Sequence, residues 1–306
     1  MWIEAGRGGA LVAALLLAAS CTPAGEAQTA AAAPPAEEDP LAAMYRSWTE
    51  PVAPFRIAGP VHYVGTAGLG MFFIPTDEGH ILVDGGLPQN APMIAESIRT
   101  LGYDPADIAI LLNTHAHFDH SGGLAELKRL SGARLLASEG DRSALEGGIY
   151  LGFEDREDLG APPVAVDGTF ADGHTVSLGG VTLTARLTPG HTRGCTSWEM
   201  QVEEAGQPLD LLIFCSASVA LNSLVNPPQY EGIVGDYRST FARTRDWRPD
   251  IFLANHTQFF DLAARRERQL AGDPLAFVDR ESFPAFIVSA EADFERRLAE
   301  ESRGSD

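Results

Sequence analysis

The chain has 306 residues, of which 45% are hydrophobic and 21% are charged, which is ordinary for a globular protein. This length is compatible with one large domain or two fused half-sheets. Acidic residues outnumber basic residues by 42 to 22, giving a formal net charge of −20. Because phosphate binding needs a basic face, this balance argues against a nucleic-acid partner.

Residues 1–21 have the features of a bacterial signal peptide. Arg7 precedes an apolar run over residues 10–19. The run is too short to span a bilayer, which takes about 20 residues, but it suits the apolar region of a signal peptide. Leu17-Ala-Ala-Ser-Cys21 resembles a lipoprotein cleavage box. The sequence therefore predicts export to the periplasm.

Two forms of the exported protein remain open. Cleavage before Cys21 would leave a lipid anchor on that residue, whereas ordinary cleavage between Ala24 and Ala30 would discard it. Residues 22–40 are rich in Ala, Pro and Glu, lack periodicity and predict a flexible linker. The folded domain is then expected over residues 41–306, with no other membrane contact, as a monomer.

The first half of the folded region is rich in short strand-like runs, at residues 61–64, 71–74 and 81–83. An amphipathic helix is predicted from Ile94 to Leu101. Between them, Asp84 opens an Asp-Gly-Gly turn. Asp84 has two interpretations, which the sequence leaves open. It either orients a nearby metal ligand by a hydrogen bond or only forms a turn.

Residues 113–123 read Asn-Thr-His-Ala-His-Phe-Asp-His-Ser-Gly-Gly and place four metal-ligating side chains within six positions: His115, His117, Asp119 and His120. The apolar run 108–112 before them predicts a buried strand. Ser121 is a candidate cap for a helix whose apolar face begins at Leu124. The cluster therefore lies on a loop after a strand, where α/β folds place their sites.

The spacing within this cluster has a physical reason. In an extended loop, residues two apart point to the same side, so His115 and His117 can hold one ion. Asp119 and His120 lie one turn further on and can hold a second. Imidazole nitrogens with one carboxylate suit zinc.

The second half predicts further strands and a group of helices. Strands are expected at residues 164–166, 175–178, 181–187 and 251–253, and helices at 236–247, 260–271 and 290–301. Strands 196–202 and 209–214 form a predicted hairpin, with Cys195 and Cys215 at its ends. In an exported protein such a pair suggests a disulfide, and the alternative is two buried free thiols.

His-Ala-His-Phe-Asp-His resembles the signature of the metallo-β-lactamase superfamily. His191 in Leu-Thr-Pro-Gly-His-Thr and His256 in Phe-Leu-Ala-Asn-His stand where that family needs further ligands. The resemblance implies an αββα four-layer sandwich with two zinc ions. It assigns the first ion to His115, His117 and His191, and the second to Asp119, His120 and His256. The remaining histidines, His62, His80 and His174, match no family ligand.

Residues 215–216 separate the branches of this family. Thioesterases and lactonases carry a Gly-Asp pair there, whose carboxylate bridges both metals, whereas this chain has Cys-Ser. Asp210 lies at the other end of the predicted strand and cannot replace that carboxylate. With His115, His120 and His256 all in place, the chain resembles the third subclass of class B. Segments 48–57, 227–230 and 236–238 resemble that subclass too.

The resemblance implies hydrolysis of the β-lactam amide bond by a metal-bound hydroxide, with Asp119 orienting the nucleophile. No Lys or Arg lies between Ser216 and Asp236, so hydroxyls and amides must bind the substrate carboxylate. Ser216, Ser218 and Asn222 are the candidates. The alternatives are a glyoxalase-like hydrolase of thioesters or lactones, and a non-catalytic zinc-binding lipoprotein.

Overall fold

A computed structural model describes residues 40–304. The predicted signal peptide and all but the last residue of the predicted linker lie outside the described residues. Among the helices that are described, none combines the length and the hydropathy needed to cross a membrane.

The first sheet has seven strands in sequence order: β1 (Phe55–Ala58), β2 (Val61–Tyr63), β3 (Phe72–Thr76), β4 (Gly79–Val83), β5 (Ile108–Leu112), β6 (Arg134–Ser138) and β7 (Gly168–Phe170). Strands β1 to β4 pair antiparallel, and β4 to β7 pair parallel. The carboxyl ends of β4 to β7 therefore meet at one edge of this sheet.

The second sheet has five strands: β8 (Thr175–Leu178), β9 (Val181–Leu187), β10 (Thr196–Glu204), β11 (Gln207–Phe214) and β12 (Ile251–Ala254). Neighbours from β8 to β11 are antiparallel, and β11 pairs parallel with β12. As a result β9, β11 and β12 run in the same direction. The loops that follow these three strands leave the sheet at one edge.

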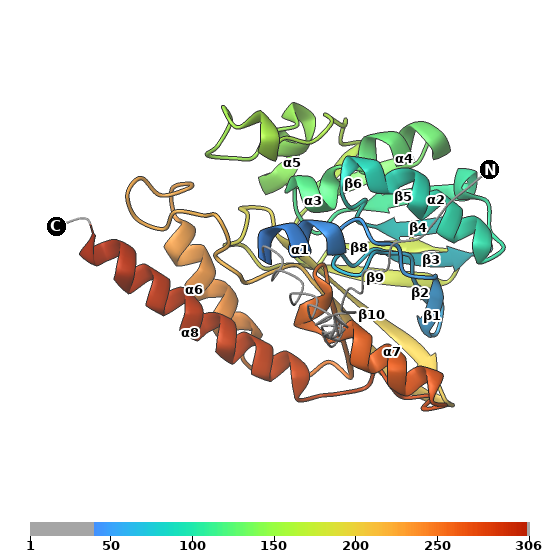
Figure 1. Cartoon of the computed structure of the whole chain (residues 1–306). Helices are drawn as coiled ribbons and strands as arrows, with labels where there is room; N and C mark the ends of the chain where they lie inside the picture. Colours follow the sequence, from blue (N-terminus) through green and yellow to red (C-terminus); the bar gives the residue numbers. More distant parts are fainter. Residues whose placement is uncertain (1–39, 305–306) are drawn as a thin grey trace, which may run out of the picture. The chain divides into compact units, whose positions relative to one another are not determined.

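The described helices are α1 (Pro40–Ser47), α2 (Ala91–Thr100), α3 (Phe118–Ser121), α4 (Leu124–Ser131), α5 (Glu139–Gly147), α6 (Ile233–Thr244), α7 (Leu262–Leu270) and α8 (Ser282–Arg303). Short 3-10 turns cover Pro88–Asn90, Pro105–Asp107, Glu157–Leu159 and Thr257–Phe259. Figure 1 shows α2, α4 and α5 on one side of the strands, with α6 and α8 on the other.

Alternation along the strands builds two apolar layers. On β4 and β5, Val83 and Leu112 face the second sheet and share a core with Trp198 and Ile213. Their neighbours Leu82 and Leu111 point the other way, into a core with α2 and α4. Since successive strand residues project to opposite faces, one strand contributes to both layers. The predicted αββα sandwich is confirmed.

Most predicted elements match the structure, including the hairpin of β10 and β11. The predicted strand at 164–166 is wrong, and the strand lies at β7 instead. Val164 and Val166 are buried, but the Val164 amide donates to Leu145 O (2.9 Å) and the Val166 amide donates to a Glu146 carboxylate oxygen (3.4 Å). These bonds to α5 occupy the donors that a sheet would use.

The predicted cap at Ser121 is also wrong. This residue ends α3, and its hydroxyl donates to the carbonyl of His117 (3.0 Å). Gly123 occupies the cap position of α4, without a side-chain bond. The intervening turn of α3 adds hydrogen bonds that fix the loop carrying the predicted metal ligands.

Candidate metal centre

All the predicted metal ligands lie just beyond the carboxyl ends of strands. His115 and His117 follow β5 in the first sheet, and Asp119 and His120 lie in the short helix α3 after it. His191 follows β9 and His256 follows β12, both in the second sheet. The two sheets thus contribute ligands at a shared edge, the usual position for sites in α/β folds.

The first group consists of His115, His117 and His191. His191 Nε2 lies 3.1 Å from His117 Nδ1 and 3.2 Å from His115 Nε2. The three rings are buried and offer ligand atoms within 4.8 Å of one another. Zinc–nitrogen bonds of about 2.0–2.1 Å in a tetrahedron place neighbouring nitrogens about 3.4 Å apart. The donor spacing therefore fits a zinc ion.

The second group consists of Asp119, His120 and His256. His120 Nε2 lies 3.2 Å from both His256 Nε2 and Asp119 Oδ2, and His256 Nε2 lies 3.5 Å from the same carboxylate oxygen. His115 joins Asp119 and His120 within 4.8 Å, so the two groups are adjacent. Two nitrogens and a carboxylate oxygen at these distances also suit zinc.

Burial sets the protonation of four of the histidine ligands. It lowers the pKa of His115 and His117 well below the usual value, that of His191 to about 4 and that of His256 to about 3. These imidazoles are neutral and offer a lone pair to a metal. For Asp119, burial alone would raise the pKa, but attraction to His120 and a hydrogen bond from it lower the pKa overall.

The tautomer of His191 follows from its hydrogen bond. Its Nδ1 lies 2.7 Å from the carbonyl oxygen of Ser218. Because a carbonyl only accepts, Nδ1 carries the hydrogen and Nε2 keeps its lone pair toward the other ligands. This is how proteins commonly orient a metal-binding histidine.

Asp84 both turns the chain and supports the ligand loop. Its backbone adopts a left-handed φ of 65°. Its buried carboxylate accepts hydrogen bonds from Asn113 Nδ2 (2.9 Å) and from the amide and hydroxyl of Thr114 (2.7 Å each). Its Oδ2 lies 3.9 Å from His120 Nδ1. The structure therefore shows the turn and a carboxylate that holds the ligand loop through Asn113 and Thr114, whereas the distance to His120 is too long for a hydrogen bond.

Asp141 is a second supporting carboxylate, and no motif in the sequence pointed to it. It lies on α5 and joins the loops on either side of it. It accepts hydrogen bonds from Ala116 N (3.0 Å), Thr192 Oγ1 (2.8 Å) and Gly194 N (2.8 Å). Ala116 separates two ligands of the first group, and Thr192 follows the third. One side chain thus fixes the backbone beside all three.

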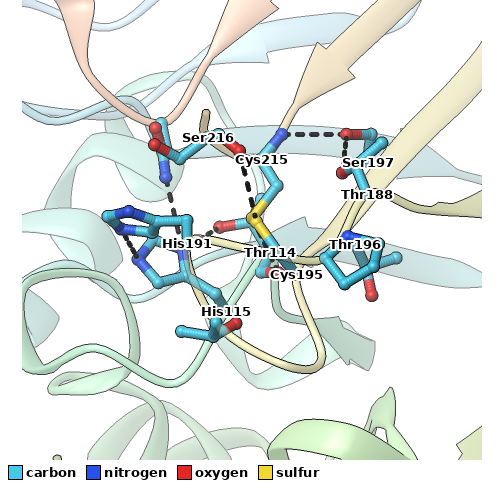
Figure 2. The surroundings of a disulfide bond; sticks show 12 residues. Thr114, His115, Thr188, His191, Cys195, Thr196, Ser197, Cys215 and Ser216 are labelled. Atoms are coloured by element: carbon cyan, nitrogen blue, oxygen red, sulfur yellow. Dashed lines mark hydrogen bonds between the residues drawn. A yellow bond between two sulfur atoms is a disulfide. The ribbon is translucent and has the colours of Figure 1, made fainter. Parts of the chain in front are cut away.

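Cys195 and Cys215 form a disulfide, as predicted, with their Cα atoms 5.8 Å apart. Figure 2 shows this bond beside Thr114 and His115. Cys215 Sγ lies 3.3 Å from Thr114 O. The disulfide thus packs directly behind the first ligand group, at the end of β11. Asp210 lies further back on β11 and is exposed.

The predicted substrate-binding residues differ in their surroundings. Ser218 is half-buried at the edge of the site, with its Oγ 3.4 Å from His191 Nδ1. Ser216 is buried, and its Oγ lies 3.2 Å from that of Ser218. Asn222 is fully buried, and its side-chain amide donates to His191 O (2.8 Å). Of the three, Ser218 is the best placed to meet a substrate.

The other histidines lie in aromatic contacts away from the ligands. His62 and His80 pack near Phe73 and Tyr103. His174 is exposed and stacks on Phe170, with ring centroids 6.0 Å apart.

Comparisons with known proteins agree with this fold and site. Residues 71–204 match the family model of the metallo-β-lactamase superfamily. A hydroxyacylglutathione hydrolase from Rhodospirillum rubrum is 30% identical over 107 residues, which is 35% of this chain and 34% of that protein. The match therefore covers only a minor part of that curated relative.

Two solved structures are similar over nearly their whole length. BJP-1, a subclass B3 metallo-β-lactamase of Bradyrhizobium japonicum, is 43% identical, with a TM-score of 0.84 over 86% of this chain and 99% of that chain. The FEZ-1 metallo-β-lactamase from Legionella gormanii is 36% identical, with a TM-score of 0.80 over 83% and 98% of the two chains.

Proposed function

This hydrolase belongs to the metallo-β-lactamase superfamily, and on that premise we propose that it cleaves the amide bond of β-lactam antibiotics with two zinc ions. The observation that carries the proposal is the identity of the two residues that follow β11. Where the thioesterases and lactonases of this superfamily have the bridging carboxylate, this chain has Ser216, which follows the disulfide-bonded Cys215. The similarity to subclass B3 enzymes over almost their entire length supports the same choice.

In this proposal each of the two ligand groups binds one zinc ion. His115, His117 and His191 would hold one ion, and Asp119, His120 and His256 the other. Bound zinc acidifies a water molecule and polarises a carbonyl oxygen. Asp119 turns its Oδ2 toward His120 and His256. Its second oxygen can accept a hydrogen bond from the attacking water and orient it.

Ser218 is the proposed contact for the substrate carboxylate. Its hydroxyl is half-buried beside His191, whereas Ser216 lies beneath it. We assign Ser216 to the support of Ser218, because the Ser218 amide donates to Ser216 Oγ (3.2 Å). Asn222 supports the loop of His191 from behind.

Turnover of a chromogenic cephalosporin, with and without a chelator, tests the function. A carbapenem, an acyl-homoserine lactone and a glutathione thioester are assayed alongside. We expect β-lactam hydrolysis that a chelator abolishes and added zinc restores. His191→Ala should be inactive and His174→Ala active, since only the first removes a predicted ligand. Turnover of the lactone or thioester without β-lactam turnover would overturn the proposal.

Thioester hydrolysis is the second candidate, and the sequence match to a hydroxyacylglutathione hydrolase favours it. The same assay separates the two candidates. A chain that holds zinc and hydrolyses none of these substrates would instead be a non-catalytic zinc-binding protein.

We also propose a periplasmic location, supported by the apolar run and cleavage box that end at Cys21. Cell fractionation tests it. A lipid anchor predicts that Cys21→Ser moves the protein from the membrane fraction to the soluble fraction, whereas ordinary cleavage predicts no change.

A further inference from the structure

Tyr150 stacks on a predicted metal ligand. It lies in the segment that connects α5 with β7, and its side chain is buried. Its ring centroid is 4.0 Å from that of His117, and the two ring planes differ by 11°. A parallel stack at this distance restricts rotation of the imidazole. Tyr150 therefore fixes the plane in which His117 presents Nδ1.

The hydroxyl of Tyr150 leads to a second ligand of the same group. It donates to Asn222 Oδ1 (3.4 Å), and Asn222 Nδ2 donates to the carbonyl of His191 (2.8 Å). Asn222 Nδ2 also lies 3.4 Å from the hydroxyl of Tyr237. Tyr237 in turn donates to Ser218 O (2.7 Å), the carbonyl that accepts from His191 Nδ1. A buried polar chain thus runs from Tyr150 to both ends of His191.

The two segments that carry this chain are fixed to each other. The side-chain amide of Gln229 donates to the carbonyl of Leu151, next to Tyr150. Gly152 packs so closely that an added Cβ would lie 2.5 Å from Gln229 Nε2. The segment after β11 therefore holds the segment that carries Tyr150 in place through the two residues that follow it.

We propose that Tyr150 is a positioning residue for the first metal site, acting on His117 through its ring and on His191 through its hydroxyl and Asn222. The second site has different support, since His256 packs against Trp48 and Phe259. Loss of Tyr150 should therefore weaken one ion and spare the other. The inference rests on the metal-binding part of the proposed function and is independent of the substrate.

Zinc titration of metal-free protein against a chromophoric chelator tests the proposal. Tyr150→Leu keeps apolar volume but loses the stack and the hydroxyl, and Tyr150→Phe loses only the hydroxyl. Tyr103→Leu is the matched control, because Tyr103 also contacts two histidine rings, His62 and His80, away from the site. Visible spectra of the cobalt-substituted proteins identify the affected site, and thermal unfolding without metal reports any general loss of stability.

We expect Tyr150→Leu to lower the affinity of one ion by about tenfold or more, the usual effect of losing a group that orients a ligand. Tyr150→Phe should show a smaller loss, and Tyr103→Leu should unfold at a lower temperature with unchanged zinc affinities. Equal weakening of both ions, or no weakening, in Tyr150→Leu would overturn the proposal. Zinc binding without β-lactam turnover by the unmodified protein would refute only the substrate.

Discussion

Replacing Asp141 with asparagine tests whether burial or hydrogen bonding has the larger effect on the pKa of this carboxyl group, which lies behind the metal ligands. Asp141 Oδ2 accepts from Ala116 N and Thr192 Oγ1, and Oδ1 accepts from Gly194 N. An asparagine that keeps its oxygen at the Oδ2 position turns an N–H group toward Gly194 N–H. That amide is left buried without an acceptor, at a cost of about 1–3 kcal/mol. At a pH where Asp141 of the unmodified protein is protonated, the Asp141→Asn variant should be less stable than the unmodified protein by this amount.

The pH dependence follows from the pKa of Asp141. Burial raises this pKa and three hydrogen-bond donors lower it. The effect of burial is larger, so the pKa rises from 3.8 to about 6. Between these values the folded protein keeps a proton that the unfolded chain has released. The stabilisation that this proton on Asp141 provides is complete below the pKa of Asp141 in the unfolded chain. It is lost as the pH rises through the folded value of about 6. A difference of about two units corresponds to about 3 kcal/mol.

Asparagine does not titrate, so the stability gap between the two proteins should close as the pH rises from about 4 to about 7. Urea unfolding, followed by circular dichroism in excess chelator, measures both free energies of unfolding. Histidine titration affects both proteins and cancels in their difference. A gap that stays constant or widens with pH would show that the three donors outweigh burial at Asp141, and the reasoning would fail.

Three further predictions concern the ligands, the substrate and the disulfide. His191→Ala and His256→Ala should each remove one zinc ion and most turnover, because two ligands do not complete a zinc site; elemental analysis showing full zinc with full rate in either variant contradicts its assignment. Ser218→Ala should mainly raise KM, by the equivalent of about 1.5–3 kcal/mol, with zinc content intact. An unchanged KM for penicillins, cephalosporins and carbapenems would move carboxylate binding elsewhere. Replacing Cys195 and Cys215 by serine should lower the free energy of unfolding by about 3 kcal/mol for a sequence separation of 20, and unaltered urea unfolding would argue against this.

Local sequence patterns predicted part of this structure. The spacing of His115 and His117 indicates that their side chains point to the same side, and the apolar run before them predicts β5. The strands before His191 and His256 were also visible, although their joint position at one edge depends on a sheet order that periodicity does not specify. The family resemblance supplied that step.

Other residues depend on tertiary structure alone. Asp141 lies in the first turn of α5, where an acidic residue is ordinary, and only the folded chain brings it three donors. Tyr150 and Asn222 come from segments without periodicity, so their directions are set by the packing of two loops. Val164 and Val166 have an alternating pattern, but their amides donate to acceptors on α5 instead of to a neighbouring strand.

Because the predicted ligands come from two sheets, zinc bound to them would tie the lifetime of the protein to metal supply. His120 and His256 are 136 positions apart, and an unfolded chain does not bring them together. Zinc at 100 times its dissociation constant would add about 2.7 kcal/mol per site to the free energy of unfolding. Where zinc is scarce, that increment would disappear, the unfolded fraction would grow and proteases would remove more of the protein. Zinc starvation would then reduce the amount of protein as well as its activity.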